Sequence, residues 1–136
     1  MLNGEIISRH DFIVRKGHHP KDSLMIVLDG SFNCTISEKN YQVCKNDIFV
    51  FNKNSYFERY VVKPISCIYI QFDMFPFALS DGLLRTEDEM RTINTISYLK
   101  RAILEKDRFL INHFTNDILF AYKSSSCSTR SEGAHV

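Results

Sequence analysis

Two segments of this chain are apolar on both faces of the strand that each would form, and this feature limits the possible folds most. Every side chain of residues 24–28 and 48–51 is apolar. Successive side chains of a strand point to opposite faces, so neither segment can turn one face to water. One face must line a closed interior and the other must be covered. We therefore expect a β-barrel whose outer face is covered by another part of the chain.

The first half of the chain has the texture of short strands. Apolar, β-branched and aromatic runs alternate with turn residues, a pattern that predicts about six to eight strands. The clearest are residues 12–15, 24–29, 32–37, 41–44, 48–51, 57–62 and 66–72. Gly30 and the pair Asn46-Asp47 separate strands, and residues 38–40 predict a polar hairpin tip. Asn46 and Asn54 tolerate the left-handed conformation that tight turns require.

After a connector at residues 75–85, the apolar spacing changes from two residues to about 3.6, which indicates helices. Thr86 and Glu89 have the spacing of a capping box, so a helix is predicted from Thr86. Its apolar stripe consists of Met90, Ile93, Ile96, Leu99 and Ile103. A second helix is predicted over residues 107–122, followed by a polar, serine-rich linker or tail at residues 124–136.

The second predicted helix carries more apolar surface than docking on one sheet requires. Phe109, Leu119 and Phe120 lie off its main stripe. A helix shared between a core and a partner subunit has this character, whereas the alternative is a deeply buried helix in a small domain. We expect these three residues to form a homodimer interface.

Composition excludes several classes of protein. The 136 residues carry 17 basic and 16 acidic side chains, a net charge of +1, so this segment lacks the basic surface that grips nucleic acid. The four cysteines form no CxxC pair and are expected to be reduced. No signal peptide and no membrane-spanning run is evident, so we expect a soluble, cytoplasmic protein with no membrane partner.

The chain shows no sign of catalytic or metal chemistry. His18 and His19 are adjacent, so on a strand they would point to opposite faces, and we expect exposed loop histidines rather than metal ligands. No nucleophile elbow, phosphate loop or catalytic cysteine signature occurs. We expect no catalytic residues, no metal and no cofactor, and hence no enzyme activity.

The last predicted strand offers a candidate ligand site. If the face formed by its isoleucines packs under the helices, Cys67, Tyr69 and Gln71 face the barrel interior as a mixed polar and apolar lining. Arg15 and Arg59 supply guanidinium groups suited to a carboxylate or to sugar hydroxyls. We predict these five residues as the ligand site, with Tyr69 as a stacking platform and Arg15 as its anchor.

The order of these elements resembles the N-terminal regulatory domain of AraC-family transcription regulators. The resemblance is carried by LDG at residues 28–30, the polar hairpin, NDIFVFNKN at residues 46–54 and IYIQF at residues 68–72, ahead of the two helices. Family members typically show Gly-Asp-hydrophobic-Pro-Gly-x-x-His in the middle motif, from which this chain departs at Asn46, Lys53 and Phe57. Arg15 and Tyr69 match positions that contact the ligand in sugar-binding members.

The resemblance implies a mainly β fold, a cupin-like jelly-roll barrel followed by two C-terminal α-helices. It also implies a small-molecule effector, for example a sugar, and contact with DNA only through a helix-turn-helix domain that is missing here. We expect an effector-binding barrel at residues 1–80 and a dimerising helical pair at residues 81–123, packed on the barrel as one domain. The alternatives are a stand-alone cupin enzyme and a dimerisation module whose barrel, filled by its own phenylalanines, binds nothing.

Overall fold

The computed structural model describes the backbone of residues 2–134 and the side chains of residues 2–122. It divides into two compact units, Met1–Leu84 and Arg85–Val136. The first unit contains the strands and the second contains the helices, so the predicted fold class, mainly β followed by two C-terminal helices, is confirmed. The boundary falls after Leu84 rather than after residue 80, because a short strand in the connector still pairs with the sheet.

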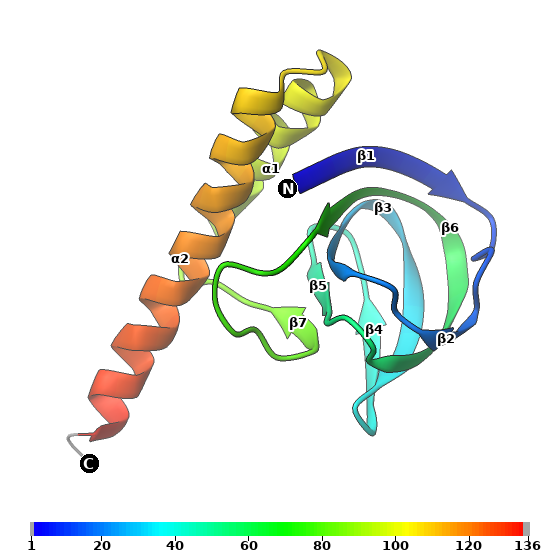
Figure 1. The fold of residues 1–136 in the computed structure, drawn as a ribbon, viewed down its shortest axis with the longest axis horizontal. Coiled ribbons are helices and arrows are strands. Elements are labelled where there is room, and N and C mark those ends of the chain that lie inside the picture. Colours follow the sequence, from blue (N-terminus) through cyan, green and yellow to red (C-terminus); the bar gives the residue numbers. More distant parts are fainter. Residues whose placement is uncertain (1, 135–136) are drawn as a thin grey trace. The chain divides into compact units, whose positions relative to one another are not determined.

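The strand unit is one curved, antiparallel, seven-stranded sheet (Figure 1). The strands are β1 Leu2–Arg9, β2 Lys16–His18, β3 Asp22–Ile36, β4 Lys39–Val43, β5 Ile48–Phe51, β6 Tyr56–Phe72 and β7 Gly82–Leu84. They lie in the order β1-β6-β3-β5-β7, with β2 also paired with β6 and β4 also paired with β3. The predicted strand at residues 48–51 is confirmed with all four side chains buried.

The two longest strands, β3 and β6, were each predicted as two shorter ones. They pair along almost their whole length, and the register of β3 slips between Val27 and Phe32. Gly30 lies in this irregular stretch with φ +79°, and a Cβ placed on it would meet the carbonyl oxygen of Pro64 at 2.1 Å. Gly30 therefore allows two backbones to approach within a continuous strand, and it does not end the strand.

The N-terminal segment differs most from the prediction. Residues 12–15 form no strand, whereas Leu2–Arg9 forms β1, which pairs with β6 from Leu2 opposite Phe72 to Arg9 opposite Ile65. Polar residues and a glycine interrupt the apolar pattern of β1, so the sequence alone gave no strand signal. The turns followed the prediction better, since Asn46 and Asn54 adopt φ values of 72° and 71°.

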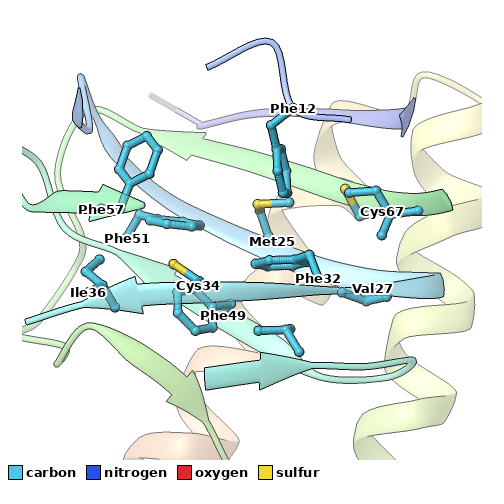
Figure 2. Close-up of a cluster of buried hydrophobic side chains, with 12 residues drawn as sticks. Phe12, Met25, Val27, Phe32, Cys34, Ile36, Phe49, Phe51, Phe57 and Cys67 are labelled. Carbon is cyan, nitrogen blue, oxygen red and sulfur yellow. The ribbon is translucent and has the colours of Figure 1, made fainter. Parts of the chain in front are cut away.

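A cluster of buried side chains fills the interior of the curved sheet. Figure 2 shows phenylalanines from different strands converging there, including Phe32, Phe49, Phe51 and Phe57. Neighbouring rings lie 5.0 Å apart for Phe49–Phe51 and 5.5 Å for Phe51–Phe57, within the range of favourable aromatic contacts. We call this set the interior cluster: Phe12, Met25, Val27, Phe32, Cys34, Ile36, Val43, Phe49, Phe51, Phe57, Ile65 and Cys67.

The helical unit begins with α1, Glu89–Leu104. The predicted capping box at Thr86 is wrong, because the N-cap is Asp88, whose carboxylate accepts the backbone N–H of Arg91 at 3.0 Å. Thr86 and Asp88 both have side chains that can cap a helix, and Asp88, which is nearer to α1, occupies the N-cap position. The predicted stripe is buried at Ile96 and Leu99, while Met90 is 68% exposed.

The second helix, α2, spans Arg108–Ala134. It continues past Tyr122 through most of the segment predicted as a linker at residues 124–136. Asp107 accepts the backbone N–H of Leu110 at 3.1 Å and so marks its beginning, as predicted. The two helices are joined by Asp117, which receives bonds from Arg91 at 2.7 Å and from the Thr95 hydroxyl at 2.9 Å. Within the described residues, neither helix is long and apolar enough to span a membrane.

Candidate functional site

The inward face of β6 carries the predicted ligand residues in the predicted alternation. Cys67 is fully buried in the interior cluster, and the half-buried Tyr69 packs against that cluster. Gln71 continues the same face and is half-buried near the end of the strand. Ile68 and Ile70 are fully buried but do not belong to the interior cluster, as expected for side chains on the opposite face.

Arg59 reaches from β6 into a group of aromatic rings. Its guanidinium carbon lies 4.3 Å from the ring centre of Phe12, 4.5 Å from that of Phe57 and 5.2 Å from that of Phe51. The Nε–H group donates to the carbonyl of Val14 at 3.1 Å, and Nη1 lies 3.6 Å from the Met25 sulfur. Burial lowers the pKa of Arg59 from its ordinary value. Among the described side chains, no carboxylate forms an ion pair with it.

His19 is buried, contrary to the prediction. It is not an exposed loop histidine, because only 2% of its surface is exposed, and its ring stacks on Phe51 at 4.8 Å. Nδ1 lies 2.7 Å from the carbonyl oxygen of Lys21, and Nε2 lies 2.9 Å from the Tyr69 hydroxyl. The adjacent His18, the last residue of β2, is exposed as expected, whereas His19 lies beyond that strand.

The hydrogen bonds of His19 define its tautomer. Burial lowers its pKa, which favours the neutral ring. A carbonyl oxygen can only accept, so the proton of the neutral ring lies on Nδ1 and is donated to Lys21. Nε2 is therefore an acceptor, and the Tyr69 hydroxyl donates to it. The oxygen of Tyr69 keeps lone pairs for another donor, but its proton is already engaged.

A cavity of about 170 Å³ lies beside Arg59 and Tyr69. Glu5, Ile7 and Arg9 of β1 line it together with Phe12, Ile13 and Val14 of the following loop. Met25, Arg59 and Tyr69 of the long strands complete its wall. We call it the Arg59 cavity. Of the five residues predicted for the ligand site, it brings together Arg59 and Tyr69 and leaves out the other three.

Arg15 does not anchor this site, in contrast to the prediction. Its guanidinium pairs with the Asp11 carboxylate, and 68% of its side chain is exposed. Only the backbone of Arg15 contacts a residue of the site, because its carbonyl oxygen accepts the backbone N–H of Arg59 at 2.7 Å. The prediction assumed a strand at residues 12–15, but this segment is a loop, so strand alternation does not decide where Arg15 points.

Glu5 and Arg9 were not predicted as residues of the site. Both line the Arg59 cavity, on the same face of β1 as Ile7. Their spacing of two residues is the signal that could have placed them together. It went unused because β1 itself was not predicted.

A second, larger hollow of about 420 Å³ lies by the β3–β4 hairpin. Thr35, Ile36, Ser37, Glu38, Ser55, Tyr56 and Glu58 line it. Beside it, Asp81 accepts hydrogen bonds from the Ser37 and Ser55 hydroxyls and from the backbone and side chain of Asn52. Burial raises the pKa of Asp81, but these four bonds outweigh it and hold the pKa below its ordinary value. The carboxylate is fully engaged in joining loops, which is a structural role.

The buried cysteines carry no charge. Cys34 and Cys67 are free thiols in the interior cluster, and burial raises the pKa of each to about 12. Cys44 is exposed, and Cys127 lies outside the described side chains. Within the described part of the chain, no three His, Cys, Asp or Glu side chains gather as metal ligands. The expectation of no bound metal stays a prediction.

The three residues predicted for a dimer interface differ in exposure. Phe109 is 77% exposed and Phe120 is 58% exposed, as an unpartnered apolar surface requires. Leu119 is only 1% exposed in the single chain, so it cannot contribute to that surface. It belongs with Ile118 among the buried side chains of α2.

The chain matches no protein-family model and no curated protein. Among solved structures, it is similar to a cupin superfamily protein from Desulfitobacterium hafniense, with 12% identity and a TM-score of 0.46 over 52% of this chain and 66% of that one. A conserved protein of unknown function from Streptococcus pyogenes has 19% identity and a TM-score of 0.47 over 57% and 67%. A cupin-2 domain protein from Shewanella frigidimarina has 14% identity and a TM-score of 0.45 over 52% and 69%. At such values the likenesses carry no argument about what this chain binds or does.

Proposed function

We propose that this chain is the effector-binding and dimerisation domain of an AraC-type transcription regulator. It senses a small molecule in its barrel and acts on DNA through a helix-turn-helix domain outside these 136 residues. It forms a homodimer in the cytoplasm and catalyses no reaction. The sequence resemblance supports the family, and the two units of the structure, a barrel with a cavity and a pair of helices, suit the two tasks.

The observation that carries the sensing function is the Arg59 cavity. The half-buried guanidinium of Arg59 lies beside a hollow and among three phenylalanine rings, and no carboxylate of the described side chains forms an ion pair with it. A guanidinium that is withdrawn from water usually has an anionic partner. A ligand that supplies the missing partner explains why a guanidinium, rather than an apolar side chain, occupies this position.

Dimerisation is supported by α2. Phe109 and Phe120 leave large aromatic surfaces in water, and symmetric pairing of two copies would bury them. A dimer would also present two DNA-binding domains to the two halves of a palindromic site.

One observation favours a second candidate, a dimerisation module that binds no ligand. The interior cluster already fills much of the barrel with phenylalanine side chains (Figure 2). In this alternative the Arg59 cavity stays empty, and the protein responds to no small molecule.

A fusion experiment tests the proposed function. Residues 1–136 are joined to an unrelated DNA-binding domain that represses a reporter only as a dimer, and a panel of sugars and organic acids is added. We expect repression that is lost when Phe109 and Phe120 are both changed to Glu, and at least one compound that alters repression. A fusion that never represses, together with a monomer in sedimentation, would contradict the proposal. Repression that no compound alters would favour the ligand-free module.

A further inference from the structure

We infer that the Arg59 cavity binds a small organic carboxylate with a flat apolar body, about the size of benzoate. The inference rests on the proposed function only in treating this anion as the effector. The site is assembled by the meeting of β1, the loop after it and the two long strands, so it exists only in the folded barrel.

Three phenylalanine rings surround the guanidinium of Arg59, but no carboxylate of the described side chains pairs with it. A guanidinium has five N–H donors, and the structure engages Nε with Val14 and Nη1 with the weak acceptor sulfur of Met25. The remaining donors have no partner among the described side chains. Their fork geometry matches the two oxygens of a carboxylate, which would form two charge-assisted hydrogen bonds.

No carboxylate of the described side chains forms an ion pair with Arg59. The nearby thiols of Cys34 and Cys67 are neutral, because burial raises the pKa of each to about 12. Glu5 is the one carboxylate in the wall of the cavity, and it is exposed to solvent. A ligand carboxylate would supply the anion that pairs with Arg59.

The rest of the wall suits an apolar ligand body in both its character and the size of the cavity. Apart from the charged groups and Tyr69, the wall consists of apolar side chains, including Ile7, Phe12 and Met25. A cavity of about 170 Å³ slightly exceeds the roughly 150 Å³ that accommodates benzene in an engineered protein cavity, which leaves room for a ring and a carboxylate. A sugar has hydroxyls all around its ring and would leave several of them unpaired here.

Tyr69 refines the choice of ligand. Its proton is donated to His19, so its oxygen can only accept a further hydrogen bond. Facing a carboxylate, which has no proton to give, Tyr69 contributes its ring and not a hydrogen bond. Arg59 therefore supplies the main polar recognition, and a change at this residue should affect binding most.

Isothermal titration calorimetry on the 136-residue chain tests the inference, with benzoate as the probe and benzamide as its neutral counterpart of the same shape. We expect saturable binding of benzoate and binding of benzamide that is weaker by about tenfold or more. Inorganic phosphate and glucose serve as further probes and are expected not to bind. Equal affinity for benzamide and benzoate, preferential binding of glucose or phosphate, or no saturable binding of benzoate would overturn the inference.

Variants locate the site. Arg59→Gln should weaken benzoate binding by about 10- to 100-fold, and Arg59→Lys, which keeps the charge without the fork, should fall in between. Arg15→Gln is the matched control, because that guanidinium is exposed and paired with Asp11, and it should leave the affinity unchanged. Equal effects of the Arg15 and Arg59 changes would overturn the assignment. If Arg59→Gln does not fold, the comparison of benzoate with benzamide on the unaltered chain still tests whether the cavity prefers a carboxylate.

The result separates this inference from the proposed function. Benzoate binding to a chain whose fusion never represses would leave the inference standing and reject the regulator. A fusion that responds only to a neutral sugar would support the regulator and reject the carboxylate.

Discussion

Replacing Tyr69 with Phe removes one hydrogen bond from the barrel interior and little else. The hydroxyl of Tyr69 donates to Nε2 of His19 at 2.9 Å, and Phe keeps the ring that packs against the interior cluster. His19 is 2% exposed and stacked on Phe51, so water has little access to the nitrogen that loses its partner.

The expected loss of stability follows from that burial. A buried acceptor left without a partner costs about 1–3 kcal/mol. For a chain of this size, that loss corresponds to a fall of roughly 3–12 °C in the melting temperature. Exposed hydroxyls have no such effect, because water replaces the lost bond. Tyr98, which is 54% exposed on α1, provides the matched control, and Tyr98→Phe should change the free energy of unfolding by less than about 0.5 kcal/mol.

Urea unfolding followed by circular dichroism at pH 7 measures both variants against the unaltered chain. We expect a lower urea midpoint for Tyr69→Phe with an unchanged slope, since the surface exposed on unfolding stays the same. A loss below about 0.5 kcal/mol for Tyr69→Phe, equal to that of Tyr98→Phe, would show that Nε2 of His19 does not depend on the Tyr69 hydroxyl as a buried acceptor.

Three further predictions concern the backbone, pH and the helical unit. Gly30→Ala should cost about 3 kcal/mol in urea unfolding, because its Cβ would meet the Pro64 carbonyl and its φ is positive, and Gly17→Ala, with positive φ but open space, should cost clearly less. Burial lowers the pKa of His19 below 6.5 in the folded chain. At pH values between the folded-state pKa and 6.5, the unfolded chain therefore binds more protons at His19 than the folded chain does. Stability should therefore be full above pH 6.5 and fall as the pH drops through that window, and a pH series of unfolding experiments should show a shallower fall for His19→Gln. In sedimentation, Phe120→Glu should shift a dimer towards monomer, and at concentrations where the unaltered chain is also monomeric it should leave the melting temperature unchanged. Leu119→Glu should lower the melting temperature at those concentrations, since only Leu119 is buried in the single chain.

The sequence predicted those parts of the fold where local pattern and tertiary role agree. Residues 48–51 are apolar on both faces and form a fully buried strand with the predicted bounds. Asn46 and Asn54 occupy left-handed turn positions because their short polar side chains tolerate them. The alternation of Cys67 and Ile68 on β6 followed directly from strand geometry.

The wrong predictions have one cause. At these positions the structure depends on contacts with residues that are distant in sequence. Gly30 has the local signature of a turn, but the approach of Pro64 holds it within a continuous strand. β1 forms because β6 offers it a partner along its whole length, although its own sequence is a poor strand. His19 is buried by Phe51, a residue distant in sequence, so no local rule distinguishes it from the exposed His18.

The sequence predicted only the part of the candidate site that lies on β6, because the rest depends on how the N-terminal segment pairs. Arg59 and Tyr69 lie on a strand whose alternation could be read, and they meet at the cavity. Arg15 was misplaced and Arg9 was missed because the pairing of the N-terminal segment was unknown. Loop residues such as Val14 join the site through backbone atoms, which carry no side-chain signal in the sequence.

A ligand that binds in the barrel at Arg59 should change the Nε–Hε NMR signal of that side chain. The spectrum of the ¹⁵N-labelled chain is recorded during a benzoate titration, with the Arg59 signal assigned by its absence in Arg59→Lys. We expect the Arg59 signal to shift and saturate, while the signal of the exposed Arg15 stays in place. An Arg59 signal that does not move, or that moves without saturation in step with Arg15, would contradict binding at Arg59.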